Sequence, residues 1–346
     1  EYKSNFSYPW RYISAGLLVL AIISILSVSL GSVRIPSIAV LEILFNKVFF
    51  FESHYTWPSS WETIIWDLRL PRIILAGTVG MALSIAGASY QGLFRNPLAD
   101  PYLIGVASGA GLGATIVLAT GVPHHLFGLN LLPVAAFFGA ILAVMLTYIV
   151  ARRDEAIPIM SLILAGVAIS SLAGSITAFL MMRGDPDLRP VLNWLLGGVM
   201  LPQWNHSLVV IAYLVPSSGV VFLYARILNV LQLDEEHARQ MGVNVERTKI
   251  ILIASVSLAT AAAVSFSGII GFVGLIAPHT ARLLWGSDYR TLIPLSSTLG
   301  ASFLVVSDLI ARTAVSPGEL PVGIITALFG APFFLYLLTF RRRETM

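Results

Sequence analysis

The chain has 346 residues, of which 57% are hydrophobic and only 11% are charged. Soluble domains average roughly 45–50% apolar and about 25% charged residues, so this chain lacks the charges needed to cover a water-exposed surface. The small net charge of +3 does not favour nucleic-acid binding, and the absence of cysteine excludes disulfides and thiolate metal sites.

Ten apolar stretches are candidates for membrane-spanning helices, each of which needs about 20 apolar residues. We therefore predict an all-α, polytopic membrane protein in the lipid bilayer, with residues 1–346 forming a single transmembrane domain. The first stretch is longer than the apolar core of a signal peptide, so we expect a retained helix. Segment 36–50 is apolar on one side and is expected to lie at the membrane interface. The predicted spans are 12–31, 71–92, 101–120, 130–150, 158–181, 206–228, 250–267, 269–285, 291–311 and 323–340.

Positive charges predict the orientation of this bundle, because loops rich in Lys and Arg stay in the cytoplasm. Ten spans place both termini on one side, and that side holds fourteen of the 21 Lys and Arg residues. We therefore predict that both termini are cytoplasmic.

Two segments of the chain resemble each other. Residues 82–105 and 261–284 both run from small residues through glycine turns to a proline near the next helix. The copies begin in the second and seventh spans, and an offset of five spans inverts their orientation. Such inverted repeats are common in transporters, with the pathway at the repeat interface. Any two Ala/Gly-rich membrane helices can also look alike, so the sequence leaves this repeat open.

A polar stretch, residues 91–115, separates the second and third spans. The pairs Asn96-Pro97 and Asp100-Pro101 favour turns, because proline restricts the residue before it. The glycines that follow allow helix backbones to approach closely. We predict a tight turn back into the membrane that packs against neighbouring helices.

The largest polar insert, residues 226–250, falls between the sixth and seventh spans on the predicted cytoplasmic side. Leu233, Ala238 and Met241 lie close to helical spacing, and Gly242 suits the end of a helix, after which Asn244 begins the next. These residues alone support equally a solvated loop and a short amphipathic helix that binds a cytoplasmic partner.

Asp308 and Arg312 lie four residues apart on one helix face, in or beside the ninth span. Charges in a bilayer are costly and usually paired, so we predict a mutual ion pair near the outer surface. The alternative is an ion- or proton-coupled secondary transporter, for which Asp308 is the only candidate coupling acid. The pair His124-His125 lacks adjacent ligands, so no metal site is predicted.

Motifs for nucleotide binding and hydrolysis are absent from the sequence, including G-x-x-x-x-G-K-[ST], G-x-S-x-G and H-E-x-x-H. We therefore predict that the chain is a transporter subunit and no enzyme, with no cofactor of its own. If transport is driven by ATP, a separate partner subunit must bind the ATP.

Residues 96–114, NPLADPYLIGVASGAGLGA, resemble the signature of the permease family that carries iron–siderophore complexes, haem and cobalamin into bacteria. Those proteins are membrane subunits of type II ATP-binding-cassette (ABC) importers. Further motifs of that family are matched in family order, and the resemblance extends over nearly the whole chain. The matching segments are 68–72, 236–243, 268–284, 307–313 and 318–335.

The resemblance implies a homodimer in the bacterial cytoplasmic membrane. The dimer would work with two ABC ATPase subunits and an extracytoplasmic binding protein that delivers a metal chelate. The choice among siderophore, haem, cobalamin and oxyanion stays open, because large chelates are recognised mainly by the binding protein.

The resemblance also implies roles for particular residues. Residues 229–247 would form the coupling region that sits in a groove of the ATPase. Arg69, Arg72 and Arg312 would receive acidic residues of the binding protein; the alternative is that they snorkel or form ion pairs. Segment 183–199, with Trp194 at the interface, would line the outer mouth of the path together with the fifth span. The coupling motif is Glu236, His237, Ala238, Arg239, Gln240, Met241, Gly242 and Val243, and the signature turn is Asn96, Pro97, Asp100 and Pro101.

An inner constriction of the path is implied near Pro158, Ile159, Met160 and Ser161. Some relatives carry Ser or Thr there, whereas this chain is mostly apolar. A hydrophobic constriction can still close by excluding water. His279 falls in the family's Pro-His motif and is expected to pack or to form a hydrogen bond at a helix start.

Overall fold

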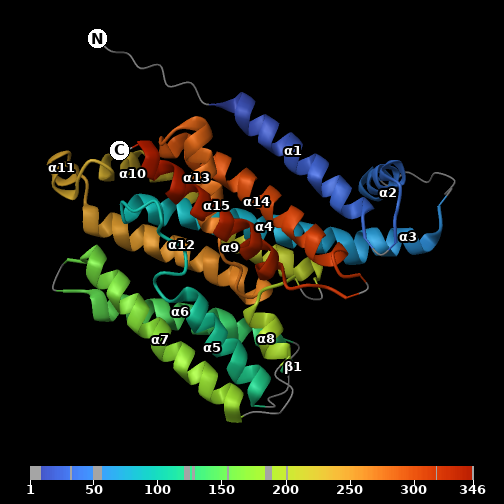
Figure 1. The fold of residues 1–346 in the computed structure, drawn as a ribbon, viewed down its shortest axis with the longest axis horizontal. Helices are drawn as coiled ribbons and strands as arrows, with labels where there is room; N and C mark the ends of the chain where they lie inside the picture. The colour runs from blue at the N-terminus through green and yellow to red at the C-terminus, as the bar shows by residue number, and fades with distance from the viewer. Residues whose placement is uncertain are drawn as a thin grey trace.

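A computed structural model describes residues 9–31, 33–49, 57–120, 125–126, 129–153, 156–183, 189–199, 202–316 and 318–344. Helices form most of this part of the chain (Figure 1), and turns connect them. Two strands of two residues each, β1 (His125–Leu126) and β2 (Leu129–Asn130), pair antiparallel. The helices are α1 (Trp10–Ser29), α2 (Ser37–Phe49), α3 (Ser59–Thr63), the π-helix η1 (Ile64–Arg69), α4 (Leu70–Leu93), α5 (Val106–Ala119), α6 (Leu131–Ala151), α7 (Ile159–Arg183), α8 (Arg189–Leu195), α9 (Trp204–Leu223), α10 (Ala225–Leu231), α11 (Glu235–Gln240), α12 (Val245–Ser267), α13 (Val273–Trp285), α14 (Tyr289–Thr313) and α15 (Val322–Glu344).

The predicted all-α membrane fold is confirmed, and each of the ten predicted spans overlaps a helix, although span 206–228 runs past the end of α9 into the separate helix α10. In the described part of the chain, seven helices are long and apolar enough to cross a membrane. Helices α5 and α13 are shorter, with 14 and 13 residues, because part of each predicted span is turn. Within segment 36–50, residues 37–49 form α2, which exposes Ile38, Leu41 and Phe45.

Helix α4 lies at the centre of the bundle, where it packs against α9, α12, α13 and α14 (Figure 1). Small residues allow these close approaches. A Cβ added at Gly80 would lie 2.3 Å from the carbonyl oxygen of Gly300 in α14. A Cβ added at Gly87 would lie 1.8 Å from that of Gly274 in α13. The core therefore depends on backbone-to-backbone packing as well as on apolar side chains.

The helices of the resembling segments are arranged alike. In each, a long helix leads through a turn into a short helix that begins after a left-handed residue, Gly105 (φ 90°) before α5 and Phe272 (φ 69°) before α13. The first turn spans 94–105 and the second only 268–272, so the two segments do not match residue by residue. Helix α4 ends on the side where α12 begins, because Gln232, before α12, donates to the carbonyl of Gly92. This antiparallel arrangement agrees with an inverted repeat.

The bundle has two opposite faces, named here after the short helices that mark them (Figure 1). The α11 face holds the ends of α4 and α13 and the starts of α7, α12 and α14. The α3 face holds the starts of α4 and α15 and the ends of α1 and α14. Tyr12, near the start of α1, contacts Trp285 at the end of α13, and α15 ends nearby (Figure 1). Both ends of the described chain therefore lie on the α11 face.

Candidate functional site

A charged cluster on the α3 face joins the start of α4 to the end of α14. Asp308 is fully buried and accepts from two arginines, Arg72 (Nε–Oδ1, 2.9 Å) and Arg312 (Nε–Oδ2, 3.0 Å). Arg72 also pairs with Glu319 through Nη1 at 2.9 Å. The predicted Asp308–Arg312 pair is therefore present, with Arg72 and Glu319 added to it. Such pairing is what a buried carboxylate requires.

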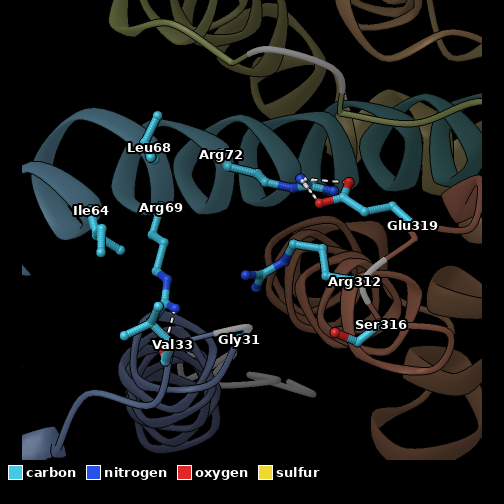
Figure 2. Close-up of a pocket in the computed structure, with 9 residues that line it drawn as sticks. All are labelled: Gly31, Val33, Ile64, Leu68, Arg69, Arg72, Arg312, Ser316 and Glu319. Carbon is cyan, nitrogen blue, oxygen red and sulfur yellow. Dashed lines mark hydrogen bonds and ion pairs between the residues drawn. The ribbon is translucent and has the colours of Figure 1, made fainter.

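Arg69 is placed differently from the other two arginines (Figure 2). It is buried, and its guanidinium donates to the carbonyl oxygens of Val28, Ser29 and Val33 at and beyond the end of α1. The last carbonyls of a helix lack intrahelical partners, so Arg69 supplies donors to them; the Ser29 carbonyl also accepts from the Ile35 N–H at 3.1 Å. A Cβ at Gly31 would lie 2.6 Å from Arg69 Nη2, so glycine makes room for the guanidinium. Arg69 ends the π-helix η1, a geometry that is frequent at functional sites.

A pocket of about 230 Å³ opens between these side chains (Figure 2). Its three arginines outnumber Glu319 and the adjacent Asp308 by one charge. Glu319 is the most accessible of the charged groups, with 53% of its side chain exposed. A pocket with guanidinium donors and a net positive charge suits a carboxylate ligand. Its lining is Gly31, Val33, Ile64, Leu68, Arg69, Arg72, Arg312, Ser316 and Glu319.

On the α11 face, the polar insert forms two short helices, α10 and α11. The structure has a short helix in this insert, but of the three predicted apolar positions only Ala238 is buried, whereas Leu233 and Met241 flank the helix and are exposed. Ala238 is buried, whereas Glu236, His237 and Arg239 are exposed. Asp234 caps the helix start by accepting from the Glu235 N–H at 2.7 Å. Gly242 follows the helix end with a φ of 84° and has no atom within 4 Å of an added Cβ.

The ends of this insert are held by polar contacts. Asn229 donates to the Asp288 carboxylate (2.8 Å) and accepts from the Tyr289 N–H (2.9 Å). Partial burial by itself would raise the pKa of Asp288, but hydrogen bonds from Arg290 and Asn229 outweigh it and lower the pKa. Arg95 forms an ion pair with Asp234 at 3.1 Å. Asn244 caps α12 by accepting from the Arg247 N–H at 3.0 Å.

The signature turn lies between α4 and α5 and contacts the other resembling segment. The Asn96 side chain accepts from the Leu98 N–H at 2.9 Å, and the Asp100 side chain accepts from the Tyr102 N–H at 2.8 Å. Both are Asx turns. The Tyr102 hydroxyl donates to the carbonyl of Ile270 at 3.0 Å. Pro97 is exposed, and Pro101 packs against Gly274.

The implied constriction lies at the start of α7. Pro158 precedes the helix, Ile159 and Ser161 are half-buried in its first turn, and Met160 is 76% exposed. The residue before them, Ile157, is 2% exposed, and both of its backbone polar groups bond to residues of α12.

Two other predicted features are placed as follows. In segment 183–199, the Trp194 side chain of α8 is 8% exposed, so it is buried within the chain, whereas the sequence predicted a position at the membrane interface. The Trp194 carbonyl packs against Gly268. His279 lies within α13, with Phe333 and Phe334 packed edge-on to its ring. His124 lies outside the described residues.

Residues 18–340 match the sequence model of the FecCD transport family. The chain belongs to this family. Among curated relatives, the cobalamin import system permease protein BtuC of Halobacterium salinarum is 47% identical, over 83% of this chain and 76% of the relative. The hemin transport system permease protein HmuU of Yersinia pestis is 40% identical, over 83% and 87%. The iron(3+)-hydroxamate import system permease protein FhuG of Bacillus subtilis is 32% identical, over 97% and 98%.

A solved structure of a metal-chelate-type ABC transporter in an inward-facing conformation also resembles this FecCD-family chain. It covers 96% of this chain and 99% of its own, with a TM-score of 0.82 and 30% identity. The chain is thus a multi-pass membrane protein of the FecCD family.

The contacts of Ile157 with Glu246 and Lys249 could not be predicted from the sequence, because a backbone partner leaves no signature in the sequence.

Proposed function

We propose that this chain is the permease subunit of an ABC importer that carries a metal chelate across the cytoplasmic membrane. The observation that carries the proposal is the exposed motif of α11, on the face opposite the arginine pocket. Family membership supports it, as do relatives named for the import of cobalamin, hemin and iron(3+)-hydroxamate. ATP would be bound and hydrolysed by separate ATPase subunits.

The proposed assembly is a homodimer with two ATPases on the α11 face and a binding protein on the α3 face. The α11 face would be cytoplasmic, which places both termini inside. Helix α7 supports the dimer, because it exposes the small residues Ser171, Gly174, Ser175 and Ala178 along one face. Small residues allow a second helix to approach closely in a membrane. A path between the two copies would be lined by such faces.

Each face would have its own task in transport. The pocket with Arg72 and Arg312 would receive acidic residues of the binding protein, with Arg69 holding the end of α1 beside them. Exposed Leu233 and Met241 flank α11 and would enter the ATPase groove with residues 236–243. Closure of the ATPases would then move α11 and the helices attached to it, including the start of α7 at 158–161.

The alternative of an ion- or proton-coupled secondary transporter is less well supported. Its candidate coupling acid, Asp308, already pairs with two arginines. A carboxylate held in this way serves as a structural bridge between α4 and α14. Family membership also favours the importer.

Uptake by the reconstituted complex tests the proposal. Proteoliposomes containing the permease and its ATPase, with binding protein outside, should take up cobalamin, hemin or a ferric hydroxamate only with ATP. Gly242→Trp should lower the ATPase stimulation caused by the binding protein, because the bulky side chain obstructs the groove contact. Gly286→Trp is the matched control: Gly286 also has a positive φ, 91°, and no atom within 4 Å of an added Cβ, but lies outside the motif. Equal loss in both variants would indicate backbone strain and argue against coupling through α11.

A further inference from the structure

The peptide groups on both sides of Ile157 are held by the first turns of α12. The Ile157 N–H donates to Glu246 Oε2 at 2.9 Å, and its carbonyl accepts from Lys249 Nζ at 3.0 Å. Ile157 precedes α7 by two residues and is 2% exposed. Side chains at the start of α12 therefore bind the backbone of the segment that leads into α7.

Lys249 also connects this segment to α11. Its ammonium group is buried, with 4% of the side chain exposed, and it contacts Glu235 Oε2 at 2.9 Å and Glu246 Oε1 at 3.2 Å. A lysine has three donors, and the carbonyl of Ile157 and these two carboxylates use all three. Glu235 is the first residue of α11. One side chain thus joins three elements: α11, α12 and the start of α7.

Ion pairs make this connection between α11, α12 and the start of α7 rigid. Arg239 lies 3.3 Å from Glu246 and 4.0 Å from Glu235, so two cations balance two carboxylates. Taking a carboxylate partner from a buried charge is unfavourable. Moving α11 away would take Glu235 from Lys249 and leave Glu246 as its one carboxylate partner, so the lower-energy response is for the start of α7 to follow α11.

The group formed by Lys249, Glu246, Glu235 and Arg239 matters because the rest of α7 packs against other helices. Its main packing partners are α5 and α6. The segment that Lys249 holds leads directly into the implied constriction at 158–161. A hollow of about 610 Å³ borders the group on the α11 face, with Arg153, Arg239, Gly242 and Glu246 on its rim. A partner pressing there would act on two members of the group.

We propose that Lys249 and Glu246 are positioning residues that transmit movement of α11 to the first turn of α7. The proposal rests on the proposed function, because it requires an ATPase that moves α11. It adds the route by which that movement reaches the constriction.

The experiment measures movement of α7 directly in the full complex. Because the chain has no cysteine, Met160→Cys supplies a single thiol on an exposed side chain in the first turn of α7. Its rate of modification by a soluble maleimide is compared without nucleotide and with ATP plus vanadate. With Lys249 in place, we expect the two rates to differ by about fivefold or more, in the range of typical coupling between sites.

Lys249→Met keeps the length of the side chain but removes its charge and its donors. In this variant the two rates should become equal, while the ATPase still binds and hydrolyses ATP. Glu246→Ala is expected to reduce the difference less, because Lys249 keeps Glu235 and the Ile157 carbonyl. Arg247→Met is the matched control, since Arg247 is an exposed cation in the same turn of α12 and should leave the difference intact.

The outcomes separate this inference from the proposed function. If the unaltered complex hydrolyses ATP but takes up none of the three chelates, the proposed function fails. If uptake works and Lys249→Met keeps the nucleotide-dependent difference at Met160→Cys, the transmission route is wrong. If Lys249→Met does not assemble with the ATPase, Glu246→Ala decides: an undiminished difference overturns the route, and a reduced one supports it.

Discussion

Arg72 and Asp308 form an ion pair at 2.9 Å between Nε and Oδ1, although 236 residues separate them in the sequence. The pair fixes the start of α4 against the end of α14. Arg72 uses Nη1 on Glu319, whose side chain is 53% exposed. An arginine expected to meet a partner protein is therefore already occupied by a carboxylate of its own chain.

Glu319→Gln tests whether this carboxylate competes with the binding protein. The change removes a negative charge from Arg72, so the pocket becomes more positive and acidic residues of the partner should arrive faster. We expect association to be several-fold faster at low salt, and the gain to disappear as salt screens the charges. Association rates measured by stopped flow across a salt series give the answer.

The control for this experiment is Glu62→Gln. Glu62 pairs with Lys47 at 2.6 Å on the same face, and its side chain is 33% exposed. The substitution therefore removes the same charge at a site away from the pocket. Equal rates for the two variants would show that only the overall charge of the face matters, and would contradict competition by Glu319.

Arg69→Met should lower stability without changing the salt dependence of docking. The carbonyl oxygens of Val28 and Val33 would lose the Arg69 donor, and a buried group left unsatisfied costs about 1–3 kcal/mol, whereas the Ser29 carbonyl keeps the Ile35 N–H at 3.1 Å. The check combines thermal unfolding in detergent with the same association series. Arg34→Met is the control, because Arg34 is exposed on this face. Unchanged unfolding with slower docking would instead make Arg69 a docking residue.

The sequence was most informative where local spacing determines the contact. The pair Asp308–Arg312 follows from i,i+4 spacing, and the ten apolar stretches predict the helices. The second partner of Asp308, Arg72, could not be predicted, because it depends on how α4 and α14 pack. The role of Arg69 was also hidden, since its partners are carbonyl groups. The short α13 follows from a left-handed Phe272, a conformation rare for a bulky residue.

Gly87→Ala should disrupt the packing of α4 on α13. The added methyl would lie 1.8 Å from the carbonyl oxygen of Gly274, so the two helix backbones must separate. We expect a marked loss of folded protein, measured as the monodisperse fraction after solubilisation and as the unfolding temperature. Gly219→Ala is the matched control, because this helical glycine of α9 has no atom within 4 Å of an added Cβ. If Gly87→Ala is as stable as Gly219→Ala, the close packing of these helices is not needed for the fold.

The orientation of the two faces can be tested with single cysteines in a chain that has none. Ser316 lines the pocket of the α3 face, and Glu236 lies in α11; both are exposed. The excess of Lys and Arg on the α11 side predicts that this side stays in the cytoplasm. An impermeant maleimide added to intact cells should therefore label Ser316→Cys and spare Glu236→Cys. In inside-out vesicles stripped of the ATPase, whose groove would cover α11, the pattern should reverse, which also shows that each thiol can react. Labelling of Glu236→Cys in intact cells, with Ser316→Cys protected, would invert the molecule, place the arginine pocket in the cytoplasm and contradict its proposed role in docking an extracytoplasmic binding protein.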